Sequence, residues 1–173
     1  RILSAFGNDK IGSILEVGAN MGMNLVVLKE LTDAKLFALE PNDNARGILI
    51  ESNTVPAENA LSGMAMQIAL DDSSVDLVFT CGVLIHIAPD DLLDAYKEIH
   101  RVSASYVLSI EYFSDKPEGI KYKRKDNLLF KRDFGGFWMD NFPDLALVDY
   151  GFFWRRATGH DNLTWWLFRK KSG

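Results

Sequence analysis

Cysteine is almost absent from this chain of 173 residues, which contains only Cys81. A single cysteine cannot form an intramolecular disulfide, so nothing indicates an oxidising compartment and we expect a cytoplasmic protein. Long apolar runs are also absent, since none approaches the roughly 20 residues that span a bilayer. The first residues lack the basic and apolar regions of a signal peptide. The sequence therefore predicts no membrane association.

Basic residues are not in excess either. The chain has 19 Lys and Arg against 24 Asp and Glu, a net charge of -5. Proteins that follow nucleic acid phosphates usually carry a basic face, so we expect no nucleic acid partner. With three histidines and one cysteine, the chain has no cluster at a metal-ligand spacing, and we predict no metal. A small molecule is the expected partner, and the oligomeric state is not indicated.

Repeats, low-complexity tracts and Pro/Gly/Ser-rich linkers are missing too, so no internal boundary is indicated. The composition, 47% hydrophobic and 25% charged, is typical of a globular protein. We therefore expect one domain over residues 1–173. Because the chain begins with Arg1 and not with Met, we also expect that its N-terminus is truncated.

Apolar periodicity along the chain predicts alternating strands and helices. Helices are expected over 21–31, around 48–49, over 89–102 and over 132–141, and a long polar loop over 114–127. Strands are expected over 13–17, 35–39, 64–68, 75–80, 106–112, 145–154 and 163–169. The alternation predicts an α/β domain with a mostly parallel sheet and helices on both faces.

A glycine-rich loop, Glu16-Val-Gly-Ala-Asn-Met-Gly22, follows the first expected strand and precedes a helix. Glycines there let the backbone approach a ligand, and free N–H groups at the start of the helix face it. The loop indicates a nucleoside-type cofactor, although two glycines alone also occur in plain tight turns. It lacks the third glycine of the dinucleotide fingerprint G-x-G-x-x-G, which weakens a nicotinamide assignment.

Glu40 ends the second expected strand, 18 residues beyond Gly22. A carboxylate at this position can accept hydrogen bonds from ribose hydroxyls. The alternative is a solvated acid at a strand end. Together with the loop, Glu40 favours cofactor binding.

The loop and Glu40 resemble the class I S-adenosylmethionine-dependent methyltransferases, whose motif is E-x-G-x-[GN]-x-G. The resemblance runs from about Ile11 to Phe168. It implies a Rossmann-like fold with a seven-stranded, mostly parallel sheet, an antiparallel last strand, and S-adenosylmethionine as cofactor. Asn20 stands where many members have glycine, so this position must accommodate a side chain. The cofactor-binding residues expected from the resemblance and the fold are Glu16, Gly18, Asn20, Gly22, Asn24, Glu40, Pro41, Asn42, Cys81 and Gly82.

Further segments resemble the pseudaminic acid biosynthesis-associated methylases. They are Thr80-Cys-Gly-Val-Leu-Ile-His-Ile87 with Pro89, Glu111-Tyr112, Leu129-Phe-Lys-Arg-Asp-Phe134, Val148-Asp-Tyr-Gly-Phe152 and Leu163-Thr-Trp165. This narrower resemblance implies a methyltransferase of a sugar pathway, without defining the acceptor atom. The expected acceptor is a small polar molecule, such as an amino-sugar or nucleotide-sugar of surface-glycan biosynthesis.

Methyl transfer from a sulfonium needs alignment and, for some acceptors, a base that removes a proton. The carboxyl ends of the first, fourth and fifth strands should meet at one crevice. This places His86, Glu111 and Tyr112 as the catalytic candidates, because an imidazole or carboxylate can accept a proton. The alternatives are that His86 caps a helix or bonds within the core, and that Glu111 is a paired structural acid.

A local basic run crosses the expected long loop of this acidic chain. Arginine binds phosphate and carboxylate groups in a bidentate manner, which would suit an anionic or sugar-like acceptor. A solvated charged loop is the alternative. The substrate-binding candidates in the run are Lys123, Arg124, Lys131 and Arg132.

Three functions remain in competition. A methyltransferase acting on a small acceptor is favoured by the loop, Glu40 and both resemblances. A NAD-dependent oxidoreductase shares the strand, loop, helix and acid, but the missing glycine disfavours it. A non-catalytic module that binds S-adenosylmethionine is the third, because a fold does not establish chemistry.

Overall fold

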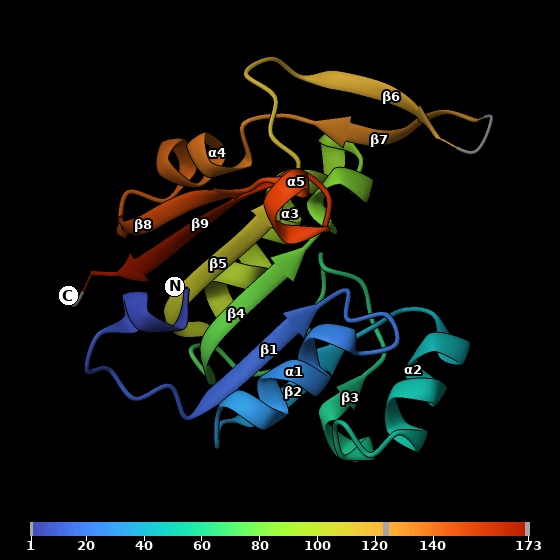
Figure 1. Ribbon diagram of the computed structural model, residues 1–173, viewed down its shortest axis with the longest axis vertical. Coiled ribbons are helices and arrows are strands. Elements are labelled where there is room, and N and C mark those ends of the chain that lie inside the picture. The colour runs from blue at the N-terminus through green and yellow to red at the C-terminus, as the bar shows by residue number, and fades with distance from the viewer. Residues whose placement is uncertain (1, 123–124, 172–173) are drawn as a thin grey trace.

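The computed structural model describes residues 2–122 and 125–171. A seven-stranded sheet forms its centre (Figure 1). In spatial order the strands are β3 (Ala60–Leu61), β2 (Lys35–Leu39), β1 (Ser13–Val17), β4 (Val75–Cys81), β5 (Ser103–Glu111), β9 (Leu163–Lys170) and β8 (Leu145–Phe153). The first five strands pair in parallel, whereas β9 is antiparallel to both β5 and β8. The expected sheet with its antiparallel last strand is confirmed.

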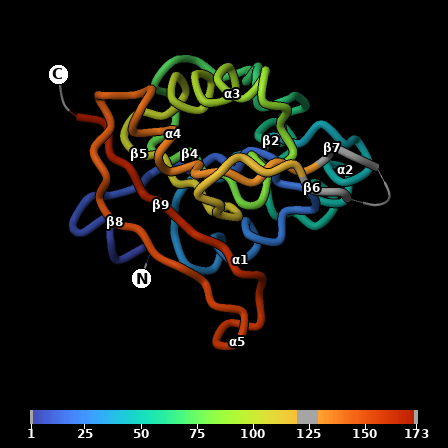
Figure 2. The backbone as a smooth tube through the Cα atoms, turned by 90° about the horizontal axis from the view of Figure 1, so that it is seen from above, coloured from blue at the N-terminus to red at the C-terminus, as the bar shows by residue number. Residues whose placement is uncertain are grey.

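The helices lie on both faces of the sheet, as Figure 2 shows for α3 and α1 on opposite sides. The α-helices are α1 (Met23–Leu31), α2 (Asp43–Glu51), α3 (Pro89–Val102), α4 (Phe134–Asn141) and the single turn α5 (Arg155–Thr158). Three 3-10 turns are η1 (Leu3–Phe6), η2 (Ala57–Asn59) and η3 (Leu84–His86). None of the described helices is long and apolar enough to cross a membrane.

Two hydrophobic cores sandwich the sheet because successive side chains of a strand point to opposite faces. On β1, Ile14 packs in one core with Leu25 of α1 and Leu49 of α2. The neighbouring Leu15 packs in the other core with residues of α3 and α4, such as Tyr96. Strands buried on both faces read as continuous apolar runs, which is why the central strands were predictable.

Helix α3 has the bounds that the sequence predicted. Pro89 occupies its first turn with Asp90 and Asp91, and His100 and Arg101 lie in the last turn. Proline suits a first turn where its missing N–H is not needed, and this order of charges matches the helix dipole. The expected helix over 89–102 therefore agrees with the structure at both of its ends.

The strand expected over 64–68 is wrong. β3 is the short Ala60–Leu61, and residues 64–68 turn instead, with Gln67 N donating to Met64 O. Polar side chains of α3 take the hydrogen bonds of this segment: Glu98 accepts from Ile68 N at 2.8 Å and Arg101 donates to Ile68 O at 2.9 Å. Backbone groups satisfied by side chains have no need of a neighbouring strand.

The long loop expected over 114–127 is also wrong, because most of it belongs to a hairpin. Strands β6 (Glu118–Tyr122) and β7 (Lys125–Lys131) pair antiparallel and form a second sheet above the main one (Figure 1). The many charges of this stretch hid the pairing signal. The helix expected from residue 132 begins at Phe134, where the Asp133 side chain caps it by accepting from Gly136 N at 2.8 Å.

Candidate functional site

A cavity of about 740 Å³, which we call the first cavity, opens at the carboxyl ends of β1, β2 and β4. Three short segments after these strands form its walls, together with residues 63–66 and the turn that carries His86. Nine of the ten expected cofactor-binding residues line it: Glu16, Gly18, Asn20, Asn24, Glu40, Pro41, Asn42, Cys81 and Gly82.

The glycine loop bends through left-handed backbone at three positions. Gly18, Asn20 and Gly22 have φ values of 74°, 50° and 80°. A Cβ atom on Gly18 would lie 2.5 Å from the Val83 side chain, and one on Gly22 would lie 2.8 Å from that of Leu49. Asparagine tolerates this backbone better than most residues, which explains Asn20. Gly22, the tenth expected residue, is the N-cap of α1 and does not line the cavity.

Glu40 is buried and links the glycine loop after β1 to the turn after β2 through two hydrogen bonds. One carboxylate oxygen accepts from Asn20 N at 2.8 Å and the other from Asn42 N at 2.8 Å. The Asn42 side chain in turn accepts from Ala45 N and caps α2. Each oxygen of the carboxylate keeps a second lone pair. The carboxylate can therefore accept hydrogen bonds from a ligand in the cavity.

Glu16 is buried at the end of β1 and bonded on one side only. Asn24 Nδ2 donates to its Oε1 at 2.6 Å, whereas Oε2 has no partner among the described residues. Burial raises the pKa of the Glu16 carboxyl to about 8, and the nearby Glu40 adds to the rise. An unpartnered buried carboxylate oxygen on a cavity wall suits a cationic ligand.

Glu111 lies behind the wall of the first cavity. It is fully buried, and its Oε1 accepts from Val83 N and Leu84 N, both at 3.1 Å. Burial raises its pKa to about 7, opposed by these backbone hydrogen bonds. Glu111 therefore anchors Val83, which follows β4, and the start of η3, the turn that carries His86.

His86 and Cys81 both reach the first cavity. His86 is exposed on η3 and lines the cavity. Cys81 is half-buried, and burial followed by the charges of Glu111 and Glu16 raises its thiol pKa to about 12. A thiol with this pKa stays protonated at neutral pH and is a poor nucleophile.

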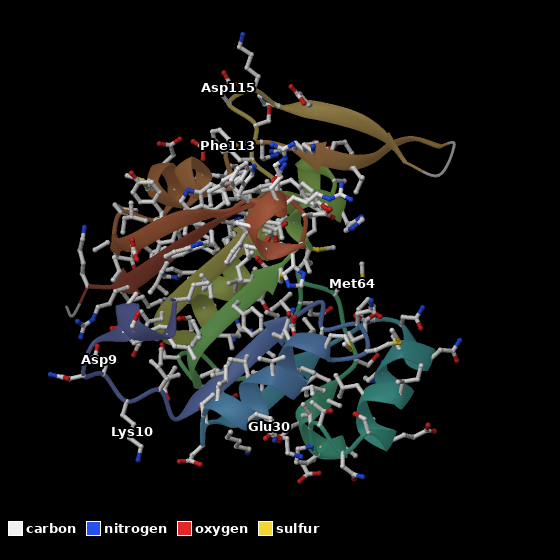
Figure 3. The ribbon with its side chains drawn as sticks, viewed as in Figure 1. Asp9, Lys10, Glu30, Met64, Phe113 and Asp115 are labelled. Carbon is white, nitrogen blue, oxygen red and sulfur yellow. The ribbon has the colours of Figure 1, made fainter. Side chains whose placement is uncertain are left out.

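Several residues of the first cavity were missed by sequence reasoning. Exposed ones include Met23, Met64 and Asp91, and Figure 3 labels Met64 on the loop that follows β3. The signal that could have placed the loop residues is topological, because the segment after β3 must end at the same sheet edge as those after β1 and β2.

A second cavity, of about 760 Å³, lies at the carboxyl end of β5, beside the base of the β6–β7 hairpin and α5. Tyr112 and Lys131 line it, and the Lys131 ammonium lies 5.1 Å from the centre of the Tyr112 ring. Arg132 does not line it; its Nε is buried without a partner among the described residues. Lys123 and Arg124 lie outside the described residues.

Tyr112 is engaged within the second cavity. Its hydroxyl donates to the Asp161 carboxylate, on the turn between α5 and β9. Burial and the hydrogen bond to Asp161 raise the pKa of Tyr112 to about 12.

The described residues include no cluster of His, Cys, Asp and Glu that could hold a metal ion.

Residues 15–105 match the family described as "Methyltransferase domain". A search of curated proteins gives no match for this chain.

Solved structures share the fold at low identity. A SAM-dependent methyltransferase from Leishmania major is 17% identical with a TM-score of 0.79, covering 96% of this chain and 68% of the other. The 1,6-didemethyltoxoflavin-N1-methyltransferase of Burkholderia thailandensis is 15% identical with a TM-score of 0.76, over 99% and 76%. A protein from Pyrococcus horikoshii is 12% identical with a TM-score of 0.74, over 98% and 86%.

These likenesses establish the fold, and the family match spans more than half of the chain. The chain therefore belongs to the methyltransferase domain family and is an S-adenosylmethionine-dependent methyltransferase.

Proposed function

We propose that the chain binds S-adenosylmethionine in the first cavity and methylates a small-molecule acceptor. The observation that carries this assignment is the pairing of Glu40 with the glycine loop: Glu40 accepts from Asn20 N at 2.8 Å and lines the same cavity as Gly18. Glu40 offers its remaining lone pairs to ribose hydroxyls, and the space beside Gly18 admits a ligand to the backbone.

The donor set of the cavity matches the charge of this cofactor. Glu16, with its unpartnered Oε2, faces a ligand that carries both an ammonium and a sulfonium group. When bound, S-adenosylmethionine supplies an electrophilic methyl group. The remaining expected residues, Asn24, Pro41, Asn42, Cys81 and Gly82, are proposed as its contacts on the cavity wall.

His86 is proposed as the proton acceptor, because it is exposed within the first cavity. When an acceptor nitrogen or oxygen is methylated, the His86 imidazole would take up the proton that this atom loses. Glu111, which is buried away from the cavity, is proposed as a positioning residue for this turn and Tyr112 as part of the acceptor site.

The acceptor is proposed to be an anionic or sugar-like small molecule, with an amino-sugar or nucleotide-sugar as the narrower candidate. Lys131 on the second cavity supports an anionic group, and the segment resemblance around Glu111-Tyr112 supports a sugar pathway. Lys123, Arg124 and Arg132 were expected beside Lys131, and only Lys131 is found on a cavity wall among the described residues.

Calorimetric titration with S-adenosylhomocysteine, the product of methyl transfer, tests the cofactor assignment. We expect micromolar binding and no binding of NAD. In Glu40→Ala we expect about 100-fold weaker binding, because the two loops lose the hydrogen bonds of Asn20 N and Asn42 N to Glu40, and the ribose loses its acceptor. Glu51→Ala, at the exposed end of α2, is the matched control and should bind normally. Binding of NAD in place of S-adenosylhomocysteine would favour the oxidoreductase.

Tight binding without turnover across a panel of acceptors would favour a non-catalytic module. The panel should contain nucleotide-sugars, amino-sugars and aromatic acids.

A further inference from the structure

The second cavity is nearly equal in size to the first and is not needed to hold the cofactor. It lies at the carboxyl end of β5, and the first lies at the ends of β1, β2 and β4. Figure 3 labels Phe113 from the wall of the second cavity and Met64 from that of the first, on different sides of the end of β4.

The two cavities adjoin through neighbouring strands. Gly82, on the wall of the first cavity, donates its N–H to Ile110 O of β5 at 2.8 Å. Tyr112, two residues further along, lines the second cavity. Paired strands lie about 4.8 Å apart. A molecule in the second cavity can therefore extend toward the first across the ends of β4 and β5.

Aromatic side chains form much of the wall of the second cavity. Phe113 and Phe152 are 50% and 59% exposed, a large apolar area left open to solvent. The buried Trp166 lies behind Phe113, with the two ring centres 6.3 Å apart. Exposed aromatic faces stack well against flat rings of a ligand.

The cavity wall carries two cations, Lys131 and Arg155, beside two carboxylates that already accept hydrogen bonds. Lys131 and Arg155 both line the cavity, and neither belongs to an ion pair among residues 2–119 and 129–171, whose side chains are described. The two carboxylates on the wall are already engaged: Asp133 caps α4 through Gly136 N, and Asp161 accepts from the Tyr112 hydroxyl. An anionic group in the cavity could therefore bind both cations.

We propose that the second cavity is the acceptor site, and that it selects an acceptor with both a flat ring and an anionic group. Phe113 and Phe152 contact the ring, and Lys131 and Arg155 bind the phosphate or carboxylate. The inference rests on the proposed methyl transfer. Two sources share this chemistry, a nucleotide portion of a sugar nucleotide and an aromatic acid.

Calorimetric titrations of the full chain with uridine diphosphate and with salicylate distinguish the two sources. Uridine has the ring without the anion and inorganic phosphate has the anion without the ring, so both serve as controls. We expect one of the two probes to bind at least tenfold more tightly than uridine or phosphate.

Three variants locate the binding. Arg155→Gln and Phe152→Ala should each weaken the binding of that probe about tenfold while leaving S-adenosylhomocysteine binding unchanged. Arg156→Gln is the matched control, because Arg156 neighbours Arg155 on α5 but is not on the cavity wall. Normal circular dichroism spectra establish that each variant is folded.

The outcomes separate this inference from the proposed function. Absence of S-adenosylhomocysteine binding in the wild type overturns the proposed function, and the acceptor site with it. Normal S-adenosylhomocysteine binding overturns the acceptor site alone in two cases: when neither probe binds, or when Arg155→Gln and Phe152→Ala both leave probe binding unchanged.

Discussion

The two cavities differ in how the chain builds them. The first draws its wall from a few contiguous segments between Glu16 and Asp91, among them those with Gly18 and Glu40. The second collects side chains from segments far apart in sequence, from Tyr112 to Trp166. A cavity of the first kind is encoded locally and suits a constant ligand. One of the second kind depends on tertiary assembly, so it can vary with the acceptor.

The largest expected effect is that Gly18→Ala weakens cofactor binding without changing binding in the second cavity. The new Cβ would lie 2.5 Å from Val83 Cγ2, on a backbone with φ of 74°. We expect S-adenosylhomocysteine to bind about 100-fold more weakly, with the uridine diphosphate and salicylate titrations unaffected. Gly159→Ala is the control, because Gly159 has φ of 76° with open space around its Cβ position. Equal losses in both cavities would show that the two are not independent.

The next effect concerns Glu111, which joins the two cavities from within the core. Its pKa is raised from 4.5 to about 7, so the folded chain holds a proton that the unfolded chain releases. The contribution of Glu111 to the free energy of unfolding is therefore complete below pH 4.5, declines as the pH rises, and is lost once the pH has passed 7. Glu111→Gln lacks the titrating proton, so its free energy of unfolding should fall less steeply than that of the wild type between pH 4.5 and 7, by up to about 1.4 kcal/mol per pH unit.

Urea unfolding of wild type and Glu111→Gln at pH 5, 6, 7 and 8 measures this difference. Glutamine keeps an oxygen that can accept from Val83 N and Leu84 N. Glu51→Gln, on the surface, controls for the change in net charge. Parallel curves for wild type and Glu111→Gln would contradict the raised pKa.

A smaller effect, confined to the first cavity, is expected for Arg101→Gln. Arg101 donates to Ile68 O and Leu70 O, both at 2.9 Å, and so holds the segment after the cavity wall at 63–66. We expect S-adenosylhomocysteine affinity to fall about fivefold, with no change in the second cavity. Lys97→Gln on the same helix should have no effect. An unchanged affinity in Arg101→Gln would mean that this loop keeps its shape without the arginine.

The smallest effect is expected for Tyr112→Phe. The Tyr112 hydroxyl donates to Asp161 and its pKa is about 12, so it is occupied and remains protonated at neutral pH. We expect the affinity of the uridine diphosphate or salicylate probe to change less than about threefold, because the ring stays in place. A loss of tenfold or more would show that the hydroxyl contacts the acceptor directly.

The sequence predicted the wall of the first cavity better than that of the second, because the first is formed by contiguous segments and the second by residues far apart in sequence. The glycine loop and Glu40 carry their signal within contiguous residues, and nine of ten expected residues line the first cavity. In the second, Arg155 and Phe152 come from separate elements, and only Phe152 lies in a segment of the narrower resemblance. Their meeting with Lys131 follows from the antiparallel return of β9 beside β5 and from the hairpin.

The fold was predicted except where short-range signals misled. Residues 64–68 are apolar enough for a strand, but Glu98 and Arg101 of α3 take their hydrogen bonds. The hairpin was hidden by charge, because an antiparallel pair outside the core need not alternate in hydrophobicity. Both errors involve contacts between residues far apart in sequence, which local propensities do not take into account.

The proton on Glu16 makes ligand binding a proton-exchange reaction. With a pKa of about 8, this carboxyl is mostly neutral at pH 7 before a ligand binds, and an ammonium or sulfonium beside it favours the ionised form. Binding then expels hydrogen ions into the medium. The heat observed in a titration should change with the ionisation enthalpy of the buffer, with a slope equal to the number of protons released.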